Sequence, residues 1–116
     1  MNKTVLIIDT DKTMMDLMKS TLEFQDFSVI AITDPAKAKK TIKSEAVDIV
    51  IADIMISNVD MIKFAKAIRK KCPVIMTGIK DLLSNERRSL FCENIPFLQK
   101  PLSPNTLSDK VRELVS

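Results

Sequence analysis

Asp48-Ile49-Val50-Ile51-Ala52-Asp53 is the segment that decides the fold, because it joins a fully apolar run to a terminal carboxylate. Four consecutive apolar residues, three of them β-branched, are typical of a strand covered on both faces, as in a parallel sheet. The run ends at Asp53. In open α/β sheets ligands bind at the carboxyl ends of the strands. The segment therefore predicts a buried strand with Asp53 at the ligand-binding edge.

Apolar runs of this kind alternate over the whole chain with segments whose apolar residues recur at helical spacing. Further strands are expected at residues 4–8, 27–32, 74–76 and 95–98. Asp34-Pro35 and Ser103-Pro104 are typical of helix starts. The helices are expected as follows: one with the stripe Met14, Leu17, Met18 and Leu22; one from Pro35 to about Ala46; one with Met61, Phe64, Ala65 and Ile68; one within 82–91; and one with Leu107, Val111, Leu114 and Val115. Five such units predict a single α/β domain over residues 1–116, a flavodoxin-like doubly wound (βα)5 fold with a five-stranded parallel sheet and helices on both faces.

Composition limits the classes of function. No apolar run approaches the roughly 20 residues that span a bilayer, and the N-terminus shows no signal-peptide pattern, so a cytoplasmic protein without membrane contact is expected. Basic residues cluster in 37–43 and 63–71, which are expected to be solvated helix faces. The chain has no Trp or Tyr and no nucleic-acid-binding motif, so no nucleic acid is expected.

The cysteines do not predict a metal centre. Cys72 and Cys92 lack CxxC spacing, and the chain has no His, so a zinc site would lack its usual ligands. Both are expected to be reduced thiols in or near the core.

Four predicted strands end in residues whose side chains can bind ions or take part in catalysis. Asp9, Asp53, Thr77 and Lys100 follow or end the first, third, fourth and fifth strands. At one edge of a parallel sheet they would combine two carboxylates, a hydroxyl and an ammonium group. Phosphoryl transfer needs this inventory, because its catalysis consists mostly of positioning and of neutralising charge on the transferred oxygens.

These segments resemble those of bacterial response regulator receiver domains over the whole chain. The matching stretches, in the family's order, are Val5-Leu-Ile-Ile-Asp-Thr-Asp11, Asp48-Ile-Val-Ile-Ala-Asp53, Val74-Ile-Met-Thr-Gly78 and Phe97-Leu-Gln-Lys-Pro101. The resemblance implies a signalling module rather than an enzyme.

The resemblance also implies a role for each residue of the site. Asp53 would accept a phosphoryl group from a sensor histidine kinase or a phosphotransfer protein. Mg²⁺ would be held by Asp53, by Asp9 and by the backbone carbonyl of Met55. Thr77 and Lys100 would bind phosphoryl oxygens, and the Lys100-Pro101 bond would be cis. Phe97 takes the position of the aromatic residue that rotates during the switch.

The chain departs from the family pattern close to Asp53. Thr10 stands where the family places a second acidic residue, and a hydroxyl is a poorer Mg²⁺ ligand than a carboxylate, so a weakened site is expected. Asp11 is the nearest carboxylate that could compensate. Ser57 and Met61 replace a usual Pro and Gly, and the stretch from Asp53 to Thr77 is shorter than is common.

Two apolar residues flank the expected path of a hydrolytic water. Met55 and Ile79 lie two residues after Asp53 and Thr77. Their simpler interpretation is that they fill the rim of the core. The functional hypothesis is a long-lived aspartyl phosphate, because neither side chain can orient water.

Two alternatives stay open at the level of sequence. Asp9-Thr-Asp11-Lys-Thr13 also resembles the first motif of haloacid-dehalogenase-type phosphatases, with Asp9 as nucleophile, Asp11 as general acid and base, and Thr77 and Lys100 as the later motifs. The second alternative is a degenerate receiver that binds proteins without being phosphorylated.

The partners follow from the resemblance. No output domain is expected within residues 1–116, so the signal would pass to a downstream protein, to a neighbouring domain if the chain is part of a longer regulator, or through a homodimer that uses the fourth helix, the fifth strand and the fifth helix.

Overall fold

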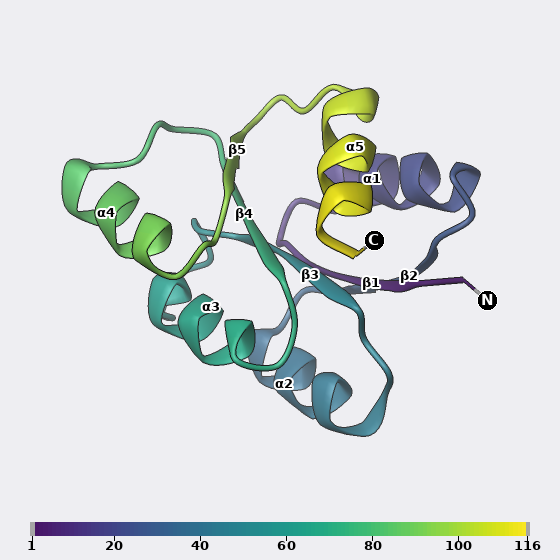
Figure 1. Cartoon of the computed structure of the whole chain (residues 1–116), viewed down its shortest axis with the longest axis horizontal. Helices are drawn as coiled ribbons and strands as arrows, with labels where there is room; N and C mark the ends of the chain where they lie inside the picture. Colours follow the sequence, from purple (N-terminus) through teal and green to yellow (C-terminus); the bar gives the residue numbers. More distant parts are fainter. Residues whose placement is uncertain (1, 116) are drawn as a thin grey trace.

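The computed structural model describes residues 2–115, which form one five-stranded parallel sheet between two layers of helices (Figure 1). The strands are β1 (Thr4–Ile8), β2 (Ser28–Ile32), β3 (Ile49–Asp53), β4 (Val74–Gly78) and β5 (Phe97–Gln99). The helices are α1 (Lys12–Phe24), α2 (Pro35–Ser44), α3 (Met61–Arg69), α4 (Ser84–Cys92) and α5 (Pro104–Val115). The strand order is β2-β1-β3-β4-β5, which confirms the predicted (βα)5 fold.

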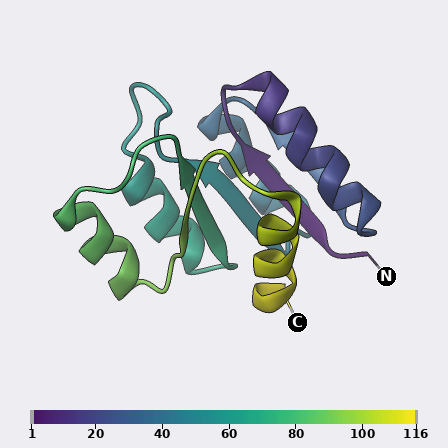
Figure 2. The same cartoon turned by 90° about the horizontal axis from the view of Figure 1, so that it is seen from above.

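Each central strand contributes side chains to two cores, because successive residues of a strand point to opposite faces. In β1, Leu6 and Ile8 belong to the core that also contains residues of α2, α3 and α4, whereas Val5 and Ile7 belong to the core that contains residues of α1 and α5. Figure 2 shows α1 and α5 on one side of the sheet and α3 and α4 on the other. Reversal of the strand order beside β1 leaves the crevice for a ligand between β1 and β3.

The first three helices begin with aspartate caps close to the carboxyl edge of the sheet. Asp11, Asp34 and Asp60 each accept a hydrogen bond from a backbone N–H of the first turn. These bonds satisfy amide groups that have no partner within the helix. At α5, Ser103 Oγ accepts the Thr106 N–H, so both predicted cap-and-proline starts are confirmed. None of the helices in 2–115 combines the length and the apolar character needed to cross a membrane.

The predicted stripe of α1 is partly wrong. Met15, Met18 and Leu22 are buried, whereas Leu17 is 51% exposed. The three buried residues share one side of the helix, and Leu17 lies about 100° around the helix from Met18, away from the sheet. Met14 is half-buried at the edge of the same core.

Other boundaries differ by a few residues. The fifth strand begins at Phe97 rather than Ile95, because the Ile95 N–H closes the end of α4 by bonding to Leu90 O, and Pro96 has no N–H to donate. The second helix ends at Ser44, not near Ala46. Cys72 is buried as predicted, but Cys92 is exposed, since α4 turns Leu90 toward the sheet instead.

Candidate functional site

The four predicted site residues meet at the carboxyl edge of the sheet, and all four are buried. Asp9 follows β1, Asp53 ends β3, Thr77 lies in β4 and Lys100 follows β5. Thr77 is paired with Asp53 in the β3–β4 register, so the short connection between them still places the two side by side. Side chains as far apart in sequence as Asp9 and Lys100 are thus brought into contact.

Lys100 joins the two carboxylates. Its Nζ donates to Asp9 Oδ2 at 2.7 Å and to Asp53 Oδ2 at 3.0 Å. The remaining oxygens accept backbone N–H groups: Asp9 Oδ1 from Asp11 at 2.9 Å, and Asp53 Oδ1 from Met55 at 2.8 Å. Every carboxylate oxygen of the site therefore has a partner, and the chain itself fixes the orientation of both groups.

Burial and pairing act against each other on these charges. Burial raises the pKa of Asp9, although the hydrogen bonds from Lys100 and the Asp11 N–H act in the opposite direction. Burial also acts to lower the pKa of Lys100, but the hydrogen bonds and attraction from Asp9 and Asp53 outweigh it and raise that pKa. Lys100 is thus held as a cation, and with both aspartates ionised the three groups carry a net charge of −1.

The hydroxyl of Thr77 has a different environment. Its Oγ1 is buried and has no hydrogen-bond partner among residues 2–115. A buried polar atom without a partner costs stability, so such atoms are uncommon in folded proteins. Beside Asp53, this hydroxyl is free to donate to a group that arrives at the acceptor carboxylate.

The residues beside Asp9 decide how well the site fits Mg²⁺. Asp11 Oδ1 accepts the Met14 N–H and caps α1, so one oxygen of the carboxylate nearest to position 10 is engaged at the start of this helix. Thr10 is exposed. Within 2–115, no group of three or more His, Cys, Asp or Glu side chains is arranged to hold a metal ion. Asp9 and Asp53 supply two hard oxygen donors, which fit Mg²⁺ in type but are fewer than a strong site needs.

Phe97 lies beside the site, against the only glycine of the chain. A Cβ added at Gly78 would come within 3.2 Å of the Phe97 ring and 2.9 Å of Ile54 Cγ2. Any residue larger than glycine at position 78 would therefore displace the Phe97 ring. Sequence reasoning did not include Gly78 or Ile54 in the site, although a lone glycine directly after Thr77 was a usable signal.

Gly78→Ala is expected to destabilise the protein by about 1–2 kcal/mol, because the ring and the Ile54 methyl must both shift in a packed region. Urea denaturation measures the loss. Ring proton shifts of Phe97 in NMR spectra test whether the side chain has moved outward. Wild-type stability together with an unmoved ring would contradict this account of the packing.

Met55 and Ile79 do not fill the rim of the core, contrary to the simpler interpretation. Their side chains are 51% and 62% exposed. They therefore present apolar surface to solvent next to the site. The Lys100-Pro101 bond is cis, as the family resemblance implies.

Comparison with known proteins connects this geometry to one family. The family model for the response regulator receiver domain matches residues 5–112 of the sequence. The chain is 26% identical to the alkaline phosphatase synthesis transcriptional regulatory protein PhoP of Bacillus subtilis (strain 168), over 99% of this chain and 49% of that protein. It is 31% identical to the response regulator GtcR of Aneurinibacillus migulanus, over 90% of this chain and 44% of that protein.

A solved structure supports the same conclusion. The receiver domain of the Francisella response regulator 1452 superimposes with a TM-score of 0.85 at 27% identity, covering 98% of this chain and 97% of that one. The chain spans about half the length, or less, of the curated relatives it matches.

Proposed function

Since the chain belongs to the response regulator receiver domain family of two-component signalling, we propose that Asp53 is its phosphoacceptor. A sensor histidine kinase or a phosphotransfer protein would supply the phosphoryl group. An Asp53 carboxylate oxygen would attack phosphorus, and the bond from phosphorus to the imidazole nitrogen of the donor would break. The family match does not favour the phosphatase hypothesis for Asp9, and the Asp11 carboxylate that it requires as acid and base caps α1.

One observation carries the proposal: the buried, unpartnered Thr77 hydroxyl lies in register with Asp53. Phosphorylation would give this hydroxyl an oxygen to bind, and Lys100 could exchange its bond with Asp53 for a bond with the same group. Both contacts exist only with the phosphoryl group in place. Such differential contacts are what a ligand-driven population shift requires.

Receiver domains generally bind Mg²⁺ at the phosphorylation site. In this chain Asp9, Asp53 and the Met55 backbone carbonyl would hold the ion, and its charge would neutralise phosphoryl oxygens when bound. Thr10 supports a weak site, because it offers a neutral hydroxyl where a third carboxylate would bind.

Thr10→Asp is expected to raise Mg²⁺ affinity by about tenfold or more, since a third hard anionic oxygen joins Asp9 and Asp53. Isothermal titration calorimetry measures the dissociation constant directly. Ser20→Asp adds the same charge at an exposed position about two turns into α1, and should leave the affinity within about twofold. Equal gains in the two variants would show a general charge effect instead of a new ligand.

Incubation with phosphoramidate or acetyl phosphate and Mg²⁺ tests the proposed function. Mass spectrometry should detect the addition of one phosphoryl group to the wild-type chain. A folded chain that stays unmodified, also with phosphorylated histidine kinase as donor, would support a receiver that binds proteins without phosphorylation.

The aspartyl phosphate is expected to last for minutes or longer, because the exposed side chains of Met55 and Ile79 cannot orient an attacking water. Met55→Asn should shorten its lifetime by about threefold or more, since the amide can hydrogen-bond water beside phosphorus. Leu17→Asn is a matched control, because Leu17 is equally exposed on α1. Loss of the phosphoryl group from the wild type within seconds would contradict the hypothesis.

The signal would leave this domain by contact with a downstream protein, with the α4–β5–α5 surface as the proposed homodimer or partner face. We also propose a cytoplasmic location, which is typical of response regulators. That residues 1–116 act as a single receiver domain without an output domain stays a prediction.

A further inference from the structure

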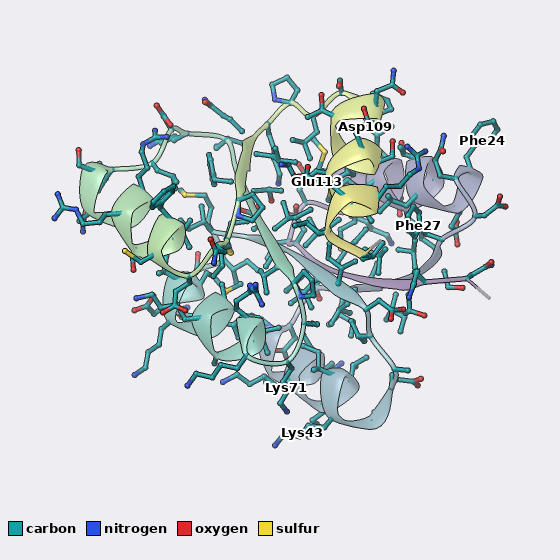
Figure 3. The ribbon with its side chains drawn as sticks, viewed as in Figure 1. Phe24, Phe27, Lys43, Lys71, Asp109 and Glu113 are labelled. Atoms are coloured by element: carbon teal, nitrogen blue, oxygen red, sulfur yellow. The ribbon has the colours of Figure 1, made fainter. Side chains whose placement is uncertain are left out.

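Half of the chain's Lys and Arg residues lie on the surface formed by α2, α3 and the two residues that follow α3. This surface, here the basic face, consists of the nine Lys and Arg residues within 37–43 and 63–71, and neither range contains an acidic residue. The other nine basic residues are outnumbered by 15 Asp and Glu residues, so the rest of the chain carries a net charge of −6. Figure 3 shows Lys43 and Lys71 on one side of the molecule and Asp109 and Glu113 of α5 on the other.

Helix stability does not account for this arrangement. Cations favour the carboxyl end of a helix, which suits Lys43 in the last turn of α2 and Arg69 in the last turn of α3. Lys37 and Lys63 lie near the amino ends, where a positive charge opposes the helix dipole. Repulsion between i and i+4 neighbours, as in Lys39 and Lys43, is also destabilising. The chain therefore maintains a charge pattern that its helices do not need.

The cations of the basic face are not neutralised within the molecule. No ion pair among residues 2–115 involves any of them. The acids closest in sequence are Glu45, Asp34 and Asp60: Glu45 takes part in none of these ion pairs, and Asp34 and Asp60 each already accept a backbone N–H. The field of the basic face is thus directed to solvent, where it attracts negatively charged partners.

The basic face also contains an apolar groove. A hollow of about 330 Å³ between α2 and α3 is lined by Lys39, Val59, Asp60, Lys63, Phe64 and Ala67. Lys39 Nζ lies over the Phe64 ring, 5.5 Å from its centroid, so it stands at the rim. Val59 is 40% exposed and Ala67 is also accessible, which gives the floor apolar surface between two lysines.

We propose that the basic face binds an acidic segment of a partner protein, with apolar side chains of the segment seated in the groove between α2 and α3. Charge complementarity defines the segment as rich in Glu or Asp, and the apolar floor requires interspersed residues such as Leu. Val59 and Asp60 belong to the loop that follows Asp53, so the bound segment would contact the loop beside the acceptor. The inference does not depend on chemistry at Asp53.

Other polyanions fit these features less well. Single-stranded nucleic acid needs exposed aromatic rings for stacking, but Phe64, the ring in the groove, is 4% exposed. Surface association with a membrane combines basic residues with large apolar side chains that insert between lipids. Val59 is the only exposed large hydrophobic residue at the groove; the others within 2–115 lie on or near α1, α4 or the loops at the carboxyl edge of the sheet.

Fluorescence anisotropy with a labelled peptide of repeating Glu-Glu-Leu tests the proposal. The peptide should bind the wild-type chain, and replacing Leu by Ser or Glu by Gln should each weaken binding severalfold. Lys39→Glu with Lys63→Glu should weaken it by about tenfold or more, because two attractive rim charges become repulsive. Lys3→Glu with Lys19→Glu makes the same change in net charge away from the groove and should weaken binding by less than about threefold.

Three results would overturn the proposal. They are the absence of peptide binding, equal losses in the two double variants, and tighter binding of duplex DNA or phosphatidylserine vesicles than of the peptide. Thermal unfolding of each variant verifies that it is folded before binding is measured.

Discussion

Replacing Asp53 by Asn is expected to lower phosphoryl uptake from phosphoramidate by at least about a thousandfold, to below detection. The amide has no anionic oxygen to attack phosphorus. Its carbonyl can still accept the Met55 N–H that Asp53 Oδ1 accepts at 2.8 Å, so the loop after β3 keeps its anchor. The variant should therefore fold, and mass spectrometry of the folded protein reports the chemistry alone.

Asp9→Asn is the matched control, because it changes the other carboxylate held by Lys100. Uptake should continue at Asp53 but more slowly, since Asp9 is a proposed ligand of Mg²⁺ and not the nucleophile. If Asp53→Asn is still modified while Asp9→Asn is not, Asp9 is the acceptor. Turnover of a phosphate ester that is lost in Asp9→Asn would support the phosphatase hypothesis.

The sequence predicted the four residues of the site because of where they lie in the repeating units. Apolar runs identify buried strands, and parallel strands bring their carboxyl ends to one edge, so Asp9, Asp53, Thr77 and Lys100 could be assigned to one place. It could not predict that Lys100 bonds both carboxylates. That depends on side-chain geometry after β5, which no local pattern encodes.

The predictions were wrong or incomplete where packing between elements decides which residues are buried and which residues touch. Leu17 and Met15 are both apolar, and the way in which α1 packs against the sheet decides that Met15 is buried and Leu17 exposed. Gly78 is noticeable in the sequence as the lone glycine, but its contacts with Ile54 and Phe97 join three segments and cannot be derived from the order of residues alone. Cys92 shows the same limit, since apolar character alone did not reveal that it is exposed.

Lys100→Met is expected to destabilise the protein by about 3 kcal/mol or more at neutral pH. Methionine fills similar space but removes the cation from two buried carboxylates, whose Oδ2 atoms lie 2.7 and 3.0 Å from Nζ. Removing one partner of a buried ion pair is costly because the remaining charge is uncompensated. Urea denaturation measures the loss, and Lys80→Met, at an exposed lysine, should change stability by less than about 0.5 kcal/mol.

Adding Asp9→Asn to Lys100→Met should recover part of this stability, because one of the two uncompensated charges disappears. If the double variant instead loses as much free energy of unfolding as the two single variants together, lost packing, and not charge, causes the effect of Lys100→Met.

The stability deficit of Lys100→Met should also shrink as the pH falls. Burial raises the pKa of Asp9 even with Lys100 present, and removing the lysine, which acts to lower that pKa, raises it further. A carboxyl group whose pKa is higher in the folded state than in the unfolded state binds a proton on folding. Its contribution to stability is therefore full below the unfolded pKa of about 3.9 and is lost as the pH rises through the folded pKa. Urea curves between about pH 8 and pH 5 should show the deficit fall by about 1 kcal/mol, whereas a deficit independent of pH would mean that the two carboxylates are not the source of the instability.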